Sequence, residues 1–144
     1  MNKLCLENQL CFKLYALSRK FTNIYRPVLE KLDITYPQYL VMLVLWEAKN
    51  ISVKDLGCRL YLDSGTLTPL LKRLEQKQLL RRQRDPLDER SVIISLTPEG
   101  KEMQLKAKRI PEHIGTCLAL SNDEYQQLKK QMDALLEHLS VETE

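Results

Sequence analysis

The residues of this 144-residue chain with the clearest capacity for chemistry are its four cysteines. Cys5, Cys11, Cys58 and Cys117 are widely spaced and form no C-x-x-C pair, which argues against a zinc site and a secreted disulfide framework. Tyr15 follows Cys11 by four residues, so on a helix the two share one face. A phenol that donates to a thiolate favours the species that attacks peroxides. Cys11 is therefore either a reactive thiol or, as is commoner for a lone helical cysteine, core filling.

The composition predicts a globular chain, with 44% apolar and 28% charged residues. Its longest apolar run, 39–46, is far shorter than the roughly 20 residues of a membrane-spanning helix. The N-terminus has no secretion signal, so we expect a cytoplasmic protein without a membrane partner. Residues 72–90 contain seven basic and four acidic side chains, and this excess of three positive charges equals the net charge of +3 of the whole chain. Such a local basic patch is typical of nucleic-acid binding.

The N-terminal third of the chain predicts two helices. Apolar residues recur at steps of three and four from 6 to 28, the stripe of one long amphipathic helix. After a break at 33–37, residues 37–49 are apolar on nearly every face and predict a central buried helix. Ser52 and Asp55 fit the N-terminal cap of a short third helix.

A turn of Asp, Ser and Gly at 61–65 separates this short helix from the next, which is the arrangement of a helix-turn-helix. Leucines fill the inward face of the second helix, and hydroxyl and cationic side chains fill the opposite face. Pro69 allows two helix starts. Either the proline lies inside the helix, where its ring meets the carbonyl of Gly65 four residues back, or the helix begins at Thr68 with Pro69 as its first residue. Both alternatives leave a polar face suited to a DNA major groove.

Residues 81–84 and 91–96 predict two strands around a turn at 85–88. A basic hairpin directly after a helix-turn-helix is a wing, whose arginines contact phosphates or the minor groove. We expect Asp88 to orient Arg90, or to pair with it across the turn. The predicted DNA-binding residues are Ser64, Thr66, Thr68, Lys72, Arg73, Arg81, Arg82, Arg84, Asp88 and Arg90.

Thr97 and Pro98 fit the start of a further helix, which we expect to be interrupted near 111–115. Ser121 and Glu124 fit a capping box for a last helix. The first and last helices have apolar stripes with little to cover in one chain, which favours a homodimer. The predicted fold is mostly α with a small β-hairpin wing, in which a winged helix-turn-helix (35–100) is flanked by dimerisation regions (1–34 and 101–144).

Three motifs resemble those of a known family. Asp88-x-Arg90 with Leu96-Thr97-x-x-Gly100 resembles the wing signature of the MarR family of winged-helix regulators. Residues 62–75 are similar to the recognition helix of its organic-hydroperoxide branch, OhrR, and residues 7–15 to that branch's reactive-cysteine motif. The resemblance covers nearly the whole chain. It implies a homodimeric repressor that leaves its operator DNA when its cysteine is oxidised by organic hydroperoxide.

The resemblance also implies roles for single residues. Tyr25 and Tyr36 match tyrosines that approach the cysteine from the partner subunit, and Tyr15 matches a third. Cys117 matches the resolving cysteine of two-cysteine members, which forms an intersubunit disulfide with Cys11. One-cysteine members would leave Cys117 without a role.

The remaining candidate groups carry weaker predictions. Cys5 and Cys58 are expected to be spectators, with Cys58 partly buried. His113 lies four residues before Cys117, but Gly115 argues against a regular helix there. Two potential metal ligands without further partners do not predict a metal site. We expect no cofactor and no metal.

Two other functions remain open. A MarR-type repressor released by a small phenolic ligand would also use a pocket of tyrosines. A thiol peroxidase is disfavoured because the chain lacks strand–helix alternation and an arginine near Cys11 in sequence, and because a helix-turn-helix would be superfluous. We therefore expect no enzyme.

Overall fold

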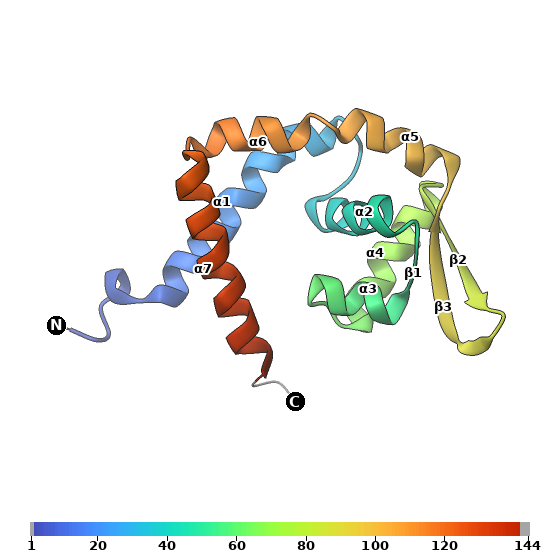
Figure 1. Cartoon of the computed structure of the whole chain (residues 1–144), viewed down its shortest axis with the longest axis horizontal. Helices are drawn as coiled ribbons and strands as arrows, with labels where there is room; N and C mark the ends of the chain where they lie inside the picture. The colour runs from blue at the N-terminus through green and yellow to red at the C-terminus, as the bar shows by residue number, and fades with distance from the viewer. Residues whose placement is uncertain (1, 142–144) are drawn as a thin grey trace. The chain divides into compact units, whose positions relative to one another are not determined.

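The computed structural model describes residues 2–141, in two compact units that meet between Arg109 and Ile110. The first unit contains all the strands found in the described residues, and the second consists of two helices (Figure 1). The elements of the first unit are the 3-10 helix η1 (Leu6–Asn8), α1 (Leu10–Glu30), α2 (Tyr36–Ala48), β1 (Asn50–Ser52), α3 (Val53–Leu60), α4 (Ser64–Gln76), β2 (Leu80–Asp85), β3 (Asp88–Leu96) and α5 (Pro98–Ala107). Those of the second are α6 (Ile110–Leu118) and α7 (Asn122–Val141).

The predicted fold class is confirmed, and several predicted helix caps are present. The Ser52 hydroxyl accepts the Asp55 backbone N–H at 3.0 Å, and the Thr97 hydroxyl accepts that of Gly100 at 3.0 Å. The Ser121 hydroxyl accepts the Glu124 N–H at 3.3 Å. Each cap satisfies a backbone donor that the first turn of a helix leaves unpaired. These short polar side chains therefore fix where the helices start.

The first helix begins later than predicted, at Leu10 and not at residue 6. Gln9 has an extended backbone, and its side-chain amide donates to the Lys3 and Cys5 carbonyls. Lys13 Nζ donates to the Glu7 carbonyl at 2.7 Å. Side chains thus satisfy the carbonyls of the segment before α1, which is something hydrophobic spacing does not report.

The helix predicted to be central is α2. Its Val41, Met42 and Leu45 are fully buried, and Leu71 of α4 and Ile94 of β3 are also in the core. The sheet is antiparallel in the order β1-β3-β2, with Ile51 of β1 opposite Ile94. The sequence prediction missed β1, because three residues are too few to show the alternation of a strand.

The interruption predicted near 111–115 is absent. α6 runs through this segment, and the chain breaks earlier, at Lys108 and Arg109. Pro111 is the second residue of α6, where a missing N–H costs no hydrogen bond. Gly115 is tolerated within the helix. No helix in residues 2–141 is both long and apolar enough to cross a membrane.

Candidate DNA-binding surface and redox site

The helix-turn-helix is formed by α3 and α4. Tyr61 ends α3 in the left-handed conformation, with a φ of 54°. The Leu62 N–H then donates to the Gly57 carbonyl at 3.0 Å. A Cβ on Gly57 would lie 2.7 Å from the Leu62 carbonyl oxygen, so only glycine allows this close turn. The sequence contained this signal, a glycine inside a short helix.

The recognition helix α4 begins at Ser64 and runs through Pro69, which decides between the two alternatives for this proline. Asp63 precedes it, and the hydrogen bond from the Thr66 hydroxyl lowers the pKa of the Asp63 carboxyl. The Thr68 hydroxyl donates to the Ser64 carbonyl at 2.7 Å. The leucines of the inward face are buried or half-buried. The predicted DNA-reading side chains are all exposed: Ser64, Thr66, Thr68, Lys72 and Arg73.

The wing is the β2–β3 hairpin, shaped by two aspartates in its turn. Asp85 accepts the Leu87 backbone N–H at 2.9 Å, and Asp88 accepts that of Arg90 at 3.0 Å. Asp88 therefore orients Arg90 through its backbone, while the Arg90 guanidinium takes part in none of the ion pairs found in residues 2–141. Arg90 presents this charge on the exposed surface of the wing, as do the similarly exposed Arg81 and Arg84.

Arg82 differs from the other wing arginines. Its Nη2 lies 2.7 Å from Glu75 Oε2, and its backbone N–H donates to Glu75 Oε1 at 3.1 Å. The hydrogen bond from Arg82 lowers the pKa of Glu75. The prediction counted Arg82 among the DNA contacts, but in the structure its guanidinium ties the wing to the recognition helix.

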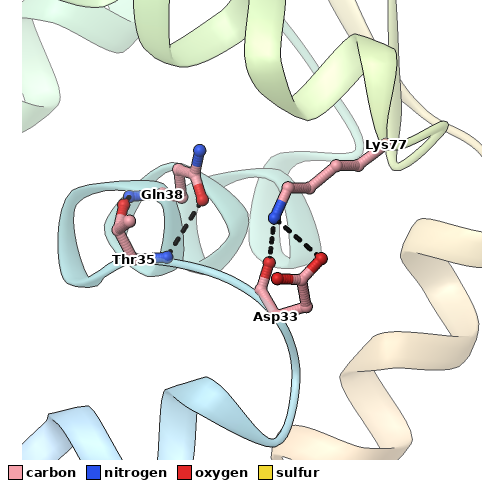
Figure 2. A network of polar contacts seen from close by, with 4 residues as sticks. All are labelled: Asp33, Thr35, Gln38 and Lys77. Carbon is pink, nitrogen blue, oxygen red and sulfur yellow. Dashed lines mark hydrogen bonds and ion pairs between the residues drawn. The ribbon is translucent and has the colours of Figure 1, made fainter.

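A second tether also starts from the C-terminal end of α4 and joins it to the loop between α1 and α2 (Figure 2). Lys77 follows the last residue of α4, and its Nζ donates to the Asp33 carbonyl and lies 3.0 Å from Asp33 Oδ2. Asp33 has a φ of 53° in the loop between α1 and α2. Beside it, the Thr35 N–H donates to Gln38 Oε1 at 2.9 Å, which completes the capping box of α2. The sequence prediction gave Lys77 no role beyond its charge.

The predicted reactive thiol, Cys11, is exposed in the first turn of α1. Tyr15 on the same helix is 60% exposed, and its hydroxyl accepts a hydrogen bond from Arg19 Nη1 at 3.1 Å. The Arg19 guanidinium also lies over the Tyr15 ring. The Tyr15 oxygen accepts in this contact, so its proton remains available to an incoming acceptor.

Tyr25 and Tyr36 lie together, with ring centroids 4.9 Å apart. Tyr25 also contacts Phe21 and Tyr39, and burial raises the pKa of Tyr36. Tyr25 stands fourteen residues after Cys11 on one helix, which corresponds to about 21 Å at 1.5 Å per residue. A single chain therefore does not bring this tyrosine pair to its own Cys11.

The other cysteines stand on separate elements. Cys117 is exposed on α6, and its Sγ lies 3.8 Å from His113 Nε2. Cys58 is exposed on α3, so the prediction that it is partly buried was wrong, and Cys5 is partly buried.

Comparisons with known proteins agree with the winged-helix fold. Residues 23–107 match the family of SarA/Rot transcriptional regulators. The chain is 56% identical, over 93% of its length and 91% of the relative's, to an organic hydroperoxide resistance transcriptional regulator of Bacillus subtilis. The solved structure of reduced AbfR bound to DNA superimposes with a TM-score of 0.82 at 41% identity, covering 96% of this chain and 95% of AbfR. A mutant of E. coli MarR, solved in complex with operator DNA, superimposes with a TM-score of 0.81 at 27% identity, covering 88% of this chain and 93% of the MarR chain.

The chain belongs to the MarR family of winged-helix transcriptional regulators. Its relatives regulate transcription and are not enzymes, so the exposed cysteines of this MarR protein belong to a regulator and not to a peroxidase. The wing signature has a structural basis here. The Thr97 hydroxyl donates to the Gln78 carbonyl, and the Gly100 carbonyl accepts Trp46 Nε1–H at 2.9 Å. A Cβ on Gly100 would lie 2.2 Å from the Leu79 carbonyl oxygen, so glycine is required for α5 to follow the wing.

Proposed function

We propose that this MarR protein is a homodimeric repressor that binds operator DNA when reduced and leaves it when organic hydroperoxide oxidises Cys11. The observation that carries the proposal is the separation along α1 of an exposed Cys11 from Tyr25, whose ring packs against Tyr36 of α2. A second copy of the chain is what would bring the tyrosines to the thiol. There their hydroxyls would donate hydrogen bonds to the thiolate, together with that of Tyr15.

The exposed apolar side chains support dimerisation through the terminal helices. On α1, Leu10 is 63% exposed and Leu17 is 54% exposed. On α7, Leu128, Met132 and Leu136 are exposed as well. On each helix these side chains recur at steps of four or seven residues and so share one face, and an exposed apolar face favours a protein interface. We assign residues 1–34 and 101–144 to the dimer and 35–100 to DNA binding.

The proposed chemistry proceeds in two steps. The Cys11 thiolate attacks the outer oxygen of the hydroperoxide, so that an S–O bond forms and the O–O bond breaks. The alcohol leaves after its oxygen takes up a proton, and Cys11 becomes a sulfenic acid. The Cys117 thiol of the partner subunit then attacks this sulfur, displaces water and forms an intersubunit disulfide.

Release from DNA would follow from the coupling of these helices to α4. In the DNA-bound state, α4 would lie in the major groove with Thr68 and Arg73 toward the bases, while Arg90 contacts a phosphate or the minor groove. The Lys77–Asp33 tether connects α4 to the loop that follows α1. A shift of α1 on disulfide formation would therefore change the position of α4 and the spacing of the two recognition helices.

The relatives support the redox signal. The Bacillus subtilis relative is concerned with organic hydroperoxide resistance, and AbfR of Staphylococcus epidermidis has been solved in reduced and disulfide forms. Overoxidised AbfR has been solved bound to DNA, so overoxidation is compatible with binding in that protein. We therefore attribute release to the disulfide.

The test is a DNA-shift titration of reduced protein with and without cumene hydroperoxide, with each sample also run on a non-reducing gel. Wild type should lose operator binding and become a covalent dimer. Cys11→Ser should bind DNA under both conditions. If Cys11→Ser is still released by hydroperoxide, Cys11 is not the sensor. If a small phenol releases the untreated wild type, the ligand-responsive alternative is favoured.

A further inference from the structure

We propose that His113 accepts the proton of Cys117 when this thiol attacks the oxidised Cys11. The inference rests on the proposed function, and it assigns to His113 a role in the disulfide step that is separate from the peroxide-reacting step.

The geometry of α6 places the two side chains together. His113 and Cys117 are one turn apart on a continuous helix, and His113 Nε2 lies 3.8 Å from Cys117 Sγ. This distance is within hydrogen-bonding range for sulfur. Both residues are exposed, so the sulfur of another subunit can approach the thiol while the imidazole remains in contact with it.

The attack of Cys117 on another sulfur requires a proton acceptor. The thiolate is the attacking species, so the thiol must lose its proton for the S–S bond to form. An imidazole can accept a proton near neutral pH. Within α6, Glu112 is the one other titratable side chain, and it is the neighbour of His113 in sequence, on a different face.

The step balances with no added reagent. The S–H bond of Cys117 breaks, and its proton moves to His113 Nε2. The thiolate attacks the sulfenic sulfur of the partner's Cys11, the S–S bond forms and the S–O bond breaks. The imidazolium returns its proton to the leaving hydroxide, so water is released and His113 is neutral again.

The first arm of the test isolates the pair from the redox cycle. In full-length Cys5→Ser/Cys11→Ser/Cys58→Ser protein, Cys117 is the one remaining thiol, and its reaction rate with iodoacetamide is measured. Adding His113→Ala should slow the reaction about tenfold, less than the effect of a buried general base. Free imidazole should restore part of the rate. The control is His138→Gln, the other histidine, which should change nothing. An unchanged rate in His113→Ala, or no rescue by imidazole, would overturn the proposal.

The second arm uses the chain with all four cysteines. His113→Ala should form the Cys11 sulfenic acid at the wild-type rate, measured by trapping with a dimedone probe. The covalent dimer should appear about tenfold more slowly, and imidazole should accelerate it. Dimerisation at the wild-type rate would contradict the role of His113. If instead Cys117→Ser still forms the covalent dimer, Cys117 is not the resolving thiol and both the proposed disulfide and the role of His113 in it fail, whatever the first arm shows of their contact.

Discussion

The DNA-binding surface and the proposed redox site are constructed in opposite ways. Two ion pairs within one unit of one chain hold the recognition helix in place. Glu75–Arg82 connects it to the wing, and Lys77–Asp33 connects it to the loop after α1. The redox residues, in contrast, are exposed or distant from one another, because Cys11 is separated from Tyr25 by about 21 Å of helix. A surface that contacts DNA can be complete in a monomer, whereas a sensor that must move both DNA-binding units gains from being completed by the second copy.

The largest expected effect tests the dependence on a second copy. Leu17→Glu adds a charge to the exposed apolar face of α1, and burying that charge in an interface is very unfavourable. The variant should be a folded monomer at micromolar concentration by analytical ultracentrifugation. Its operator affinity should fall more than about 100-fold, because a dimer contacts two half-sites. Asn23→Glu is the control, because this exposed polar position lies about 120° around α1 from both Leu17 and Cys11. A dimeric Leu17→Glu would assign the interface elsewhere.

The next prediction separates the wing arginines. Arg90→Ala should weaken binding to many DNA sequences alike, by about tenfold, and reduce the salt slope by about one, because one phosphate contact is lost. Arg82→Ala should leave the salt slope unchanged but lower the stability toward urea, because Glu75 loses its partner. Equal salt slopes in wild type and Arg90→Ala would show that Arg90 contacts no phosphate.

Thr68→Ala and Arg73→Ala address the recognition helix. Each should change which DNA sequences are preferred, since base contacts specify and phosphate contacts position. Binding selection from a randomised operator library measures this directly. A uniform loss of affinity over all sequences would remove these side chains from base recognition.

A smaller effect concerns pH. Arg82 lowers the pKa of Glu75 in the folded protein below its ordinary value of 4.5, so the folded state favours the carboxylate. This contribution to stability is complete above that ordinary value and is lost as the pH falls through the lowered folded value. Glu75→Gln should therefore reduce the loss of stability below about pH 4.5, as measured by urea unfolding at several pH values. Curves of the same shape in both proteins would contradict the account.

The smallest effect tests the tether between the two regions. Lys77→Met removes a partly exposed ion pair worth at most about 1 kcal/mol, so the reduced protein should bind its operator within about threefold of wild type. Release on oxidation should be less complete, because α4 is no longer connected to Asp33. The control is Lys106→Met, which removes an exposed pair with Glu102. Full release by oxidised Lys77→Met would show that the signal takes another route.

The two regions also differ in how far the sequence predicts them. The recognition helix and wing were predicted because hydrophobic period, caps and turn residues are local signals. The tethers of Lys77 and Arg82 were missed, since an ion pair between distant elements leaves no periodic trace. The interruption predicted at 111–115 is absent because Pro111 stands in the first turn of α6, and because Gly115 costs the helix only about 1 kcal/mol. The redox roles of Tyr25, Tyr36 and Cys117 came from family resemblance, since no spacing within one chain brings them to Cys11.

The central claim is that the sensor is completed between subunits, and mixed dimers test it most directly. Two variant chains are coexpressed and treated with cumene hydroperoxide, one with Cys11→Ser and the other with Cys117→Ser. Both also have Cys5 and Cys58 replaced by serine, and one chain is extended by a tag. Neither variant alone should form a covalent dimer on a non-reducing gel. The mixture should form one species, the covalent heterodimer, because it retains a single Cys11–Cys117 pair across the interface. A covalent dimer of either variant alone, or no heterodimer from the mixture, would contradict the account.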